Sequence, residues 1–212
     1  MGVNMAGNCI VDDEVCREAS KQEIIRRYYQ ALAGRVEETS TDEEVFKLEL
    51  LMKQAGISPE NRKVTVAAKE RADQTGGPAA AIELEDGQII TGKTSDLLGA
   101  SAALLLNTLK ELAGIQHKIH VISPVAIEPI QKLKTEYLGS KNPRLHTDEV
   151  LIALSSSAAT SDIAKLALEQ LPKLKGCQVH SSVMLSSVDK KIFKKLGVQL
   201  TTEPVYEHKK LY

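Results

Sequence analysis

The sequence predicts an α/β protein: a three-layer sandwich on a mixed five-stranded sheet, preceded by a small helical subdomain. Three observations predict this fold. Residues 12–76 carry apolar positions three and four apart, which is the period of amphipathic helices. From Pro78 onward, short strand-like segments alternate with helical ones. An Asp86-Gly87 turn joins the first two of these strands. We therefore predict a helical subdomain over residues 1–57 and an α/β subdomain over residues 58–212.

Capping residues mark the N-terminal helices. Asp12-Asp13 and Thr41 precede the first two helical patterns, and Gly34 and Gly56 follow them. The three helices are predicted over residues 12–33, 41–55 and 58–76, the third beginning with Ser and Pro. Residues 1–11 are apolar and glycine-bearing, unlike a solvated chain start, so we expect that a preceding segment is missing.

The remaining elements follow from changes of period. A helix over residues 96–113 is apolar on nearly every side, which predicts burial between layers. Hydroxyl clusters at residues 155–157 and 160–161 predict a break between two helices in the stretch 147–171. The predicted strands are residues 79–84, 88–91, 119–122, 177–185 and 198–201, and further helices cover residues 127–138 and 188–196.

Composition excludes several classes of partner. The 212 residues carry a net charge of −1 and only 3% aromatic residues, with no Trp, so we expect no nucleic-acid binding. The longest apolar run, residues 97–106, is shorter than the ~20 residues of a membrane span, so we expect no membrane association. Three cysteines without CxxC spacing, and no signal peptide, predict a cytoplasmic protein.

Residues 87–94 match the phosphate-loop pattern, because Gly87 is followed after four residues by Gly92-Lys93-Thr94. The four intervening residues favour an extended strand, and Gly87 is needed in the hairpin turn, so a nucleotide-wrapping loop is not expected. A smaller anion site at Lys93, Thr94 and Ser95, before the predicted helix, is one interpretation. Simple helix capping by these hydroxyls is the other.

Two further junctions between a strand and a helix are polar, Ser123-Pro124 and Ser186-Ser187, and helix capping explains them as well as ligand binding does. His180 lies in an alternating strand, where a structural histidine is the interpretation favoured over a Ser/His catalytic pair. The histidines and cysteines show no metal-ligand spacing, so we predict no metal site. The sequence indicates neither a cofactor nor whether the chain is an enzyme.

Five strings are specific enough to indicate a family: MGVNMAGNCI, CREASKQEIIRRYY, ITGKTSDLLGAS, NPRLHTDEVLIALS and GCQVHSSVMLSSVD. Together they make the whole chain similar to the C-terminal half of a bacterial family catalogued as domain of unknown function 1846. The resemblance implies a helical subdomain followed by an α/β subdomain. It also implies that an N-terminal half with a glycine-rich, phosphate-binding type of segment is missing.

The predicted element order also resembles the cytidine-deaminase-like fold. That resemblance implies that Lys93, Thr94, Ser95, Ser123, Ser186 and Ser187 converge at one sheet edge, where open α/β sheets bind ligands. The zinc-binding motifs of the deaminases are replaced here by Thr-Ser-Asp and Ser-Pro-Val-Ala, so zinc-dependent deamination is excluded.

Two functional hypotheses follow. In the first, the chain is part of a protein that handles a nucleotide or another phosphate-bearing small molecule, held by the six residues just named. In the second, it is a non-catalytic scaffold that docks the missing N-terminal half or forms a homo-oligomer. The second hypothesis rests on the apolar stripes of the helices before Gly56, which are wider than a peripheral helical pair can cover.

Overall fold

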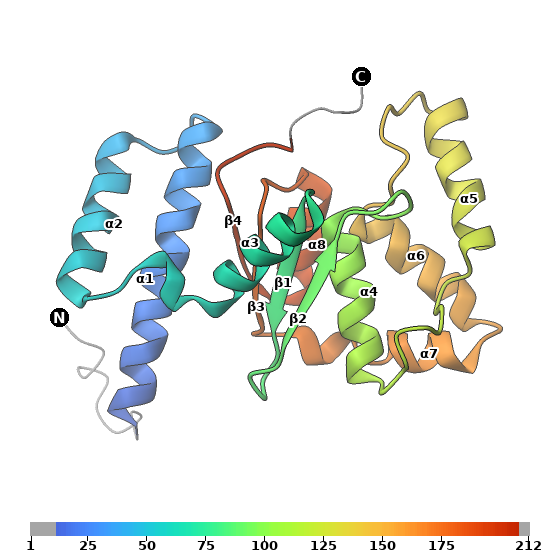
Figure 1. Ribbon diagram of the computed structural model, residues 1–212, viewed down its shortest axis with the longest axis horizontal. Coiled ribbons are helices and arrows are strands. Elements are labelled where there is room, and N and C mark those ends of the chain that lie inside the picture. Colours follow the sequence, from blue (N-terminus) through green and yellow to red (C-terminus); the bar gives the residue numbers. More distant parts are fainter. Residues whose placement is uncertain (1–11, 208–212) are drawn as a thin grey trace. The chain divides into compact units, whose positions relative to one another are not determined.

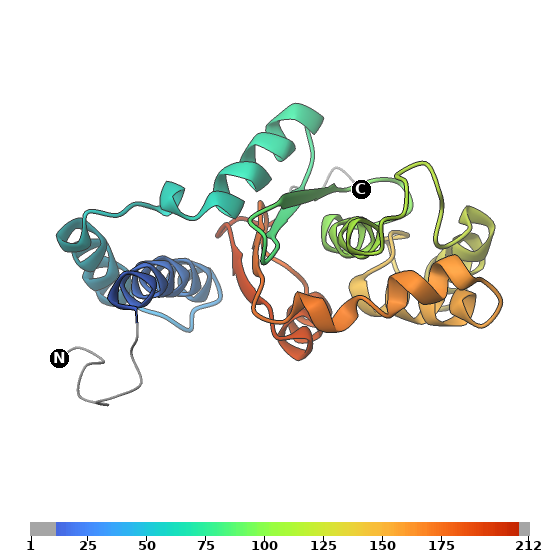
Figure 2. The ribbon, with the colours of Figure 1, turned by 90° about the horizontal axis from the view of Figure 1, so that it is seen from below.

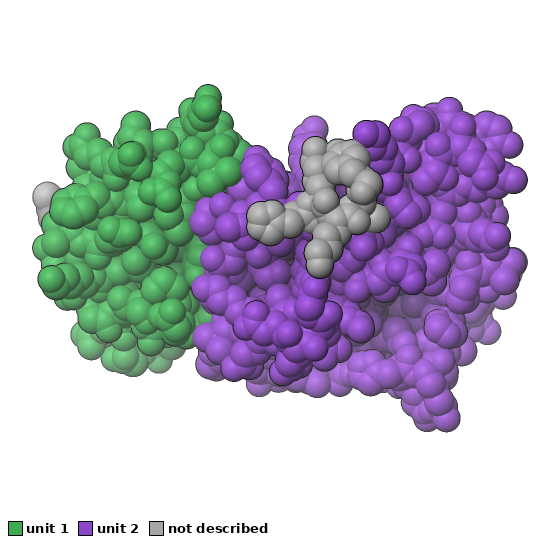
Figure 3. Space-filling model, turned by 45° about the horizontal axis from the view of Figure 1, so that its top comes forward, with its two compact units in different colours: residues 1–62 green, residues 63–212 purple. Residues whose placement is uncertain are grey.

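The computed structural model describes residues 12–207, and the chain divides into two compact units, residues 1–62 and residues 63–212 (Figure 3). Residues 1–11, whose apolar character led us to expect a missing preceding segment, lie outside the described residues. Among the described residues, no helix is both long and apolar enough to cross a membrane.

The first unit is a helical pair, α1 and α2, followed by a single 3-10 turn. Its elements are α1 (Asp13–Val36), α2 (Asp42–Ala55) and the turn Pro59–Asn61. Asp12 caps α1 by accepting hydrogen bonds from two backbone N–H groups, and Gly56 ends α2 with a left-handed backbone, both as predicted. The prediction that Gly34 ends α1 is wrong, because Gly34 is buried within the helix, where a Cβ would collide with Ser40.

The second unit holds a four-stranded mixed sheet in the order β2-β1-β3-β4 (Figure 1). Strand β1 pairs antiparallel with both β2 and β3, and β3 pairs parallel with β4. The strands are β1 (Ala79–Glu83), β2 (Ile89–Lys93), β3 (Gln178–Ser181) and β4 (Gln199–Thr202). The helices are α3 (Lys63–Thr75), α4 (Ala100–Leu112), α5 (Pro124–Lys132), α6 (Thr147–Ala158), α7 (Asp162–Leu168) and α8 (Ser187–Leu196), with a π-helical turn at Leu133–Tyr137 and a 3-10 turn at Leu171–Leu174.

The predicted fifth strand, residues 119–122, is wrong. These residues form bends without strand pairing, and the cytidine-deaminase-like order is not found among the four strands described. Val121 and Ile122 are buried in the main hydrophobic cluster. Their apolar character therefore reflects packing against the core, which a short apolar run cannot distinguish from a buried strand.

Helices cover both faces of the sheet (Figure 2). On one face, Ala81 of β1 packs against Val64 and Ala68 of α3. On the other face, Ile82 belongs to the main cluster, which also contains buried residues of α4 and Phe193 of α8. Alternate residues of β1 thus face opposite helical layers, which is why this strand is almost continuously apolar.

Strand β2 is extended, as predicted, and this excludes the phosphate-loop interpretation. Residues Ile89–Lys93 pair with β1, and Gly87 has φ of 83° in the hairpin turn. Helix α4, however, begins at Ala100 and not at residue 96. Thr94 and Ser95 therefore do not cap α4; the Ser95 hydroxyl instead accepts hydrogen bonds from the N–H groups of Leu97 and Leu98.

A buried polar network joins β3, β4 and α3. His180 is fully buried, with Nδ1 2.9 Å from the Thr201 hydroxyl and Nε2 3.2 Å from Oε1 of Glu203. Lys69 of α3 lies 3.0 Å from the same carboxylate oxygen. Burial raises the pKa of Glu203, but hydrogen bonds from His180 and Lys69 outweigh it and hold that pKa at about 2. These partners confirm His180 as a structural histidine.

Gly92→Ala is expected to destabilise the second unit by at least about 2 kcal/mol, since its Cβ would overlap the backbone of Leu104 in α4. Urea denaturation followed by circular dichroism measures the loss. Gly77→Ala is the control, because a Cβ there meets no atom within 4 Å. Equal stability of the two variants would show that β2 and α4 do not pack this closely.

Glu203→Gln is expected to lower the free energy of unfolding by about 2–3 kcal/mol at neutral pH. Because the pKa of Glu203 is lowered from 4.5 to about 2, its ionised carboxylate contributes fully to the free energy of unfolding above about pH 4.5. The difference from wild type should therefore shrink as the pH falls from about 4.5 towards 2. Denaturation across this pH range tests it, with Glu70→Gln at an exposed site as the control. A difference that is independent of pH would contradict the assignment.

Candidate functional site

A cavity of about 100 Å³ lies where the sheet's strand ends meet the start of α4. Strands β2 and β3 both run opposite to β1, so their C-terminal ends lie at the same edge of the sheet. The residues that follow these strands therefore approach each other, and Thr94 after β2 and Ser186 after β3 both line the cavity. This edge is where open α/β sheets usually bind ligands.

The N-terminus of α4 forms one wall, and its first turn is uncapped. Gly99 occupies the cap position and supplies no side chain, so the N–H groups of Ala100, Ser101 and Ala102 have no intrahelical acceptor. All four residues line the cavity. Ser101 is only 4% exposed, and its hydroxyl has no hydrogen-bond partner in the described part of the chain. Such a buried, unsatisfied hydroxyl is costly unless something else binds it.

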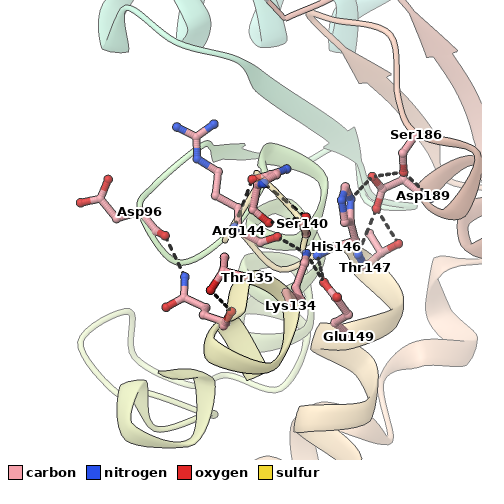
Figure 4. Close-up of polar contacts among 12 residues, drawn as sticks. Asp96, Lys134, Thr135, Ser140, Arg144, His146, Thr147, Glu149, Ser186 and Asp189 are labelled. Carbon is pink, nitrogen blue, oxygen red and sulfur yellow. Dashed lines mark hydrogen bonds and ion pairs between the residues drawn. The ribbon is translucent and has the colours of Figure 1, made fainter. Parts of the chain in front are cut away.

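The loop before α6 forms the opposite wall and carries Arg144 and His146 (Figure 4). The ammonium group of buried Lys134 donates to the Arg144 carbonyl at 2.6 Å and to Glu149 at 2.8 Å. The Glu149 carboxylate also accepts the backbone N–H of His146 at 2.7 Å. The backbone of the loop is thus held at Arg144 by Lys134 and at His146 by Glu149.

A backbone bridge holds the two walls together. The N–H of Leu145 donates to the carbonyl of Leu97 at 2.9 Å, and the N–H of Gly99 donates to the carbonyl of Leu145 at 3.1 Å. The start of α4 and the loop bearing Arg144 and His146 are therefore joined within the span 97–99, although they lie over forty residues apart in the sequence.

Asp189 in α8 orients His146 (Figure 4). One carboxylate oxygen accepts the Ser186 hydroxyl at 2.8 Å and lies 3.0 Å from Nδ1 of His146. The other accepts both the backbone N–H of Thr147, at 2.9 Å, and its hydroxyl, at 2.8 Å. Nδ1 of His146 is therefore the donor to Asp189, which leaves Nε2 for the cavity.

The two partners shift each other's pKa. The hydrogen bond to Asp189 raises the pKa of His146, although burial works in the opposite direction. Burial raises the pKa of Asp189, but hydrogen bonds from His146 and Thr147 outweigh it, and the net change is downward. Both shifts favour an imidazolium beside a carboxylate, so His146 and Asp189 form an ion pair at the cavity wall.

Arg144 faces a carboxylate of its own chain. Its guanidinium lies 2.8 Å from Glu207, which also lines the cavity. The Arg144 side chain is 19% exposed and that of Glu207 is 43% exposed. An acidic side chain thus occupies the position beside Arg144 that an anionic ligand would take.

Two of the six predicted site residues line this cavity, Thr94 and Ser186, and four do not. Lys93 is the exposed last residue of β2, and Ser95 closes a turn over Leu97 and Leu98. Ser123 precedes α5 without capping it, and Ser187 is the first residue of α8. The Ser186 hydroxyl accepts the N–H of Asp189, so it also caps α8, as predicted.

Among the cavity residues that sequence reasoning missed are Ser101, Arg144, His146 and Asp189. The signal available was weak. Ser101 lay hidden in an apolar helix whose start was placed four residues too early. Arg144 and His146 lay between two predicted helices and Asp189 lay in a short predicted helix, and no spacing rule joins residues 144–146 to residue 189.

A wider hollow of about 480 Å³ lies at the other end of the strands, lined by Glu83, Lys173 and Cys177 among others. None of its described lining residues has a buried polar atom without a partner. Among residues 12–207, no group of three or more His, Cys, Asp or Glu side chains is placed to hold a metal ion. The small cavity is therefore the candidate site, because the buried Ser101 hydroxyl without a partner and the uncapped start of α4 both line it.

Comparison with known proteins assigns the chain to a protein family. The family described as Domain of unknown function DUF1846, C-terminal, matches residues 60–212, and the corresponding N-terminal domain matches residues 1–56. The expectation of a C-terminal half alone is thus slightly off, because residues 1–56 match the N-terminal domain.

Several bacterial UPF0371 proteins are similar over the whole chain. Those of Corynebacterium efficiens and Corynebacterium urealyticum are each 58% identical, and that of Streptococcus uberis is 52% identical. The chain covers 43% of the length of each, so it spans less than half of these relatives. With matches to both domains and identities above 50%, the chain belongs to the DUF1846 family of UPF0371 proteins.

Proposed function

We propose that this chain binds a small phosphate-bearing molecule through the cavity at the start of α4. The observation that carries the proposal is the Ser101 hydroxyl, buried and without a protein partner, beside three uncapped N–H groups. A phosphate oxygen would satisfy both kinds of donor, and the helix dipole favours its negative charge.

Charge on the facing wall supports the same ligand. Lys134 and Glu149 hold the backbone of the loop at Arg144 and His146, and Asp189 orients the His146 ring. The guanidinium of Arg144 pairs with Glu207, which an anionic ligand would displace. Preorganised donors bind an anion without paying the cost of ordering loose side chains. Thr94 and Ser186 add hydroxyls from the strand ends.

The size of the cavity restricts the ligand. A volume of about 100 Å³ is well below the roughly 300–1,000 Å³ of sites that enclose a whole drug-sized molecule. The cavity therefore suits a phosphate group and not an entire nucleotide. The remainder of the ligand would lie outside, towards solvent or towards parts of a full-length family member that this chain does not include.

Arg144→Gln is expected to weaken binding of inorganic phosphate at least tenfold, which corresponds to about 1.4 kcal/mol, since it removes one of the two cations facing α4. Isothermal titration calorimetry measures the affinity. Lys93→Gln removes the same charge from the sequence-predicted site, outside the cavity, and should bind phosphate like wild type. Loss of binding in Lys93→Gln alone would move the site back to residues 93–95.

A second function has separate support in the first unit. Phe46 and Leu50, one helical turn apart on α2, are 65% and 46% exposed. Large apolar side chains gathered on one helix face often mark an interaction surface. We infer that this face of α2 contacts the remainder of a full-length family member, because the chain covers only 43% of its relatives' length.

Hydrogen exchange tests this interface. Amides in residues 42–55 should exchange more slowly in a full-length relative than in the 212-residue chain, whereas those of α5 (Pro124–Lys132) should not change. Equal exchange rates for the α2 amides in both proteins would contradict the proposed interface. Light scattering tests whether this face of α2 instead mediates self-association. In that case the mass of the chain would rise with concentration, and Phe46→Ser would return it to the monomer value.

A further inference from the structure

We infer that the cavity selects the terminal phosphate of a monoester, held as a dianion against the imidazolium of His146, and that binding is coupled to proton exchange. This inference rests on the proposed phosphate binding and adds the chemical class of the ligand. It follows from the tautomer of His146, from the similar proton affinities of a phosphate monoester and a histidine, and from the size of the cavity.

The tautomer of His146 decides whether its Nε2 donates or accepts a hydrogen bond. Asp189 accepts four hydrogen bonds, from His146, Ser186 and both donors of Thr147, so its carboxylate is held firmly in place. Because Nδ1 of His146 donates to this carboxylate, neutral His146 offers a lone pair at Nε2, and only the imidazolium offers an N–H there. An unprotonated phosphate oxygen is therefore held at Nε2 only when His146 is charged.

A phosphate monoester matches this requirement. Its second proton dissociates at a pKa of about 6, close to the value of about 6.5 for an ordinary histidine. The ligand and His146 can thus share one proton, with the dianion facing the imidazolium. A phosphodiester has one charge and no proton that dissociates at about pH 6, and a carboxylate also carries only one charge. Neither can therefore share a proton with His146 and face it as a dianion.

Each cationic group near the cavity has an acidic partner in the protein. Lys134 is paired with Glu149 at 2.8 Å, and Asp189 is paired with His146 at 3.0 Å. Arg144 is paired with Glu207 at 2.8 Å, but that carboxylate also lines the cavity and is 43% exposed. A ligand that displaces Glu207 would meet two cations, the guanidinium of Arg144 and the imidazolium of His146. The ligand would replace Glu207 at Arg144 and would also face the imidazolium of His146, whose other partner is Asp189.

The size of the cavity favours a group substituted on one side only. At about 100 Å³ it can enclose one tetrahedral phosphate group, and a monoester needs only one exit for the rest of the molecule. The oxygen atoms without substituents would then face the N–H groups of α4, the Ser101 hydroxyl and the two cations.

Calorimetry of the complete chain with methyl phosphate and dimethyl phosphate tests the inference. At a pH above the pKa of methyl phosphate and above the raised pKa of His146 in the free protein, which NMR titration of the ring locates first, methyl phosphate should bind with uptake of up to about one proton. Comparing buffers of different ionisation enthalpy detects this uptake. Dimethyl phosphate should bind at least tenfold more weakly. Equal affinities, or methyl phosphate binding without proton uptake, would overturn the inference.

His146→Gln keeps an N–H donor without the charge. It should bind methyl phosphate at least tenfold more weakly than wild type and lose the proton uptake. His117→Gln, at an exposed histidine outside the cavity, should behave as wild type. If His146→Gln does not fold, nitrogen-15 NMR of the wild-type ring still decides, since saturating methyl phosphate should raise the pKa of His146. An unchanged pKa would contradict the inference.

The outcomes also separate the inference from the proposal beneath it. If inorganic phosphate, methyl phosphate and dimethyl phosphate all fail to bind, phosphate binding itself is wrong. If the two esters bind equally and Arg144→Gln weakens both, phosphate binding stands and the monoester selectivity is wrong.

Discussion

The site depends on one buried carboxylate. Asp189 is 5% exposed, and its two oxygens accept hydrogen bonds from donors in two segments separated by about forty residues. Burying a charge is unfavourable unless every lone pair has a partner, and here the backbone, two hydroxyls and an imidazole supply them. Removing any one donor leaves the charge poorly compensated. The start of α8, the start of α6 and the orientation of His146 are therefore coupled through this residue.

A second constraint is the close approach of α4 to the sheet. Gly92 of β2 lies against the backbone of Leu104, and the alanines of β1 leave little side-chain volume on either face. Close packing of this kind orients α4 so that its first turn points at the sheet edge where β2 and β3 end. The uncapped N–H groups and the facing loop then meet across a small cavity instead of across open solvent. The position of this cavity is thus a consequence of small residues far from it.

Local rules predicted the elements that depend on neighbours in the chain. The Asp86-Gly87 turn, the cap by Asp12, the left-handed Gly56 and the helix break after α6 were all predicted and are found. The start of α4 was placed at residue 96 because Ser95 precedes an apolar run. In the structure, the residues around Leu98 pair instead with Leu145, and this long-range pairing delays the helix. The same limitation produced the false fifth strand at residues 119–122.

By itself, therefore, the sequence determined the α/β class, the helical N-terminal part, the hairpin that excludes a phosphate loop, and the family. These follow from periodicity, turn chemistry and specific strings, all of which act over a few residues. Only the tertiary structure decided which polar groups meet. Ser101 became a buried donor without a partner, and Arg144, His146 and Asp189 came together, because strand order and helix packing join segments that no local spacing relates.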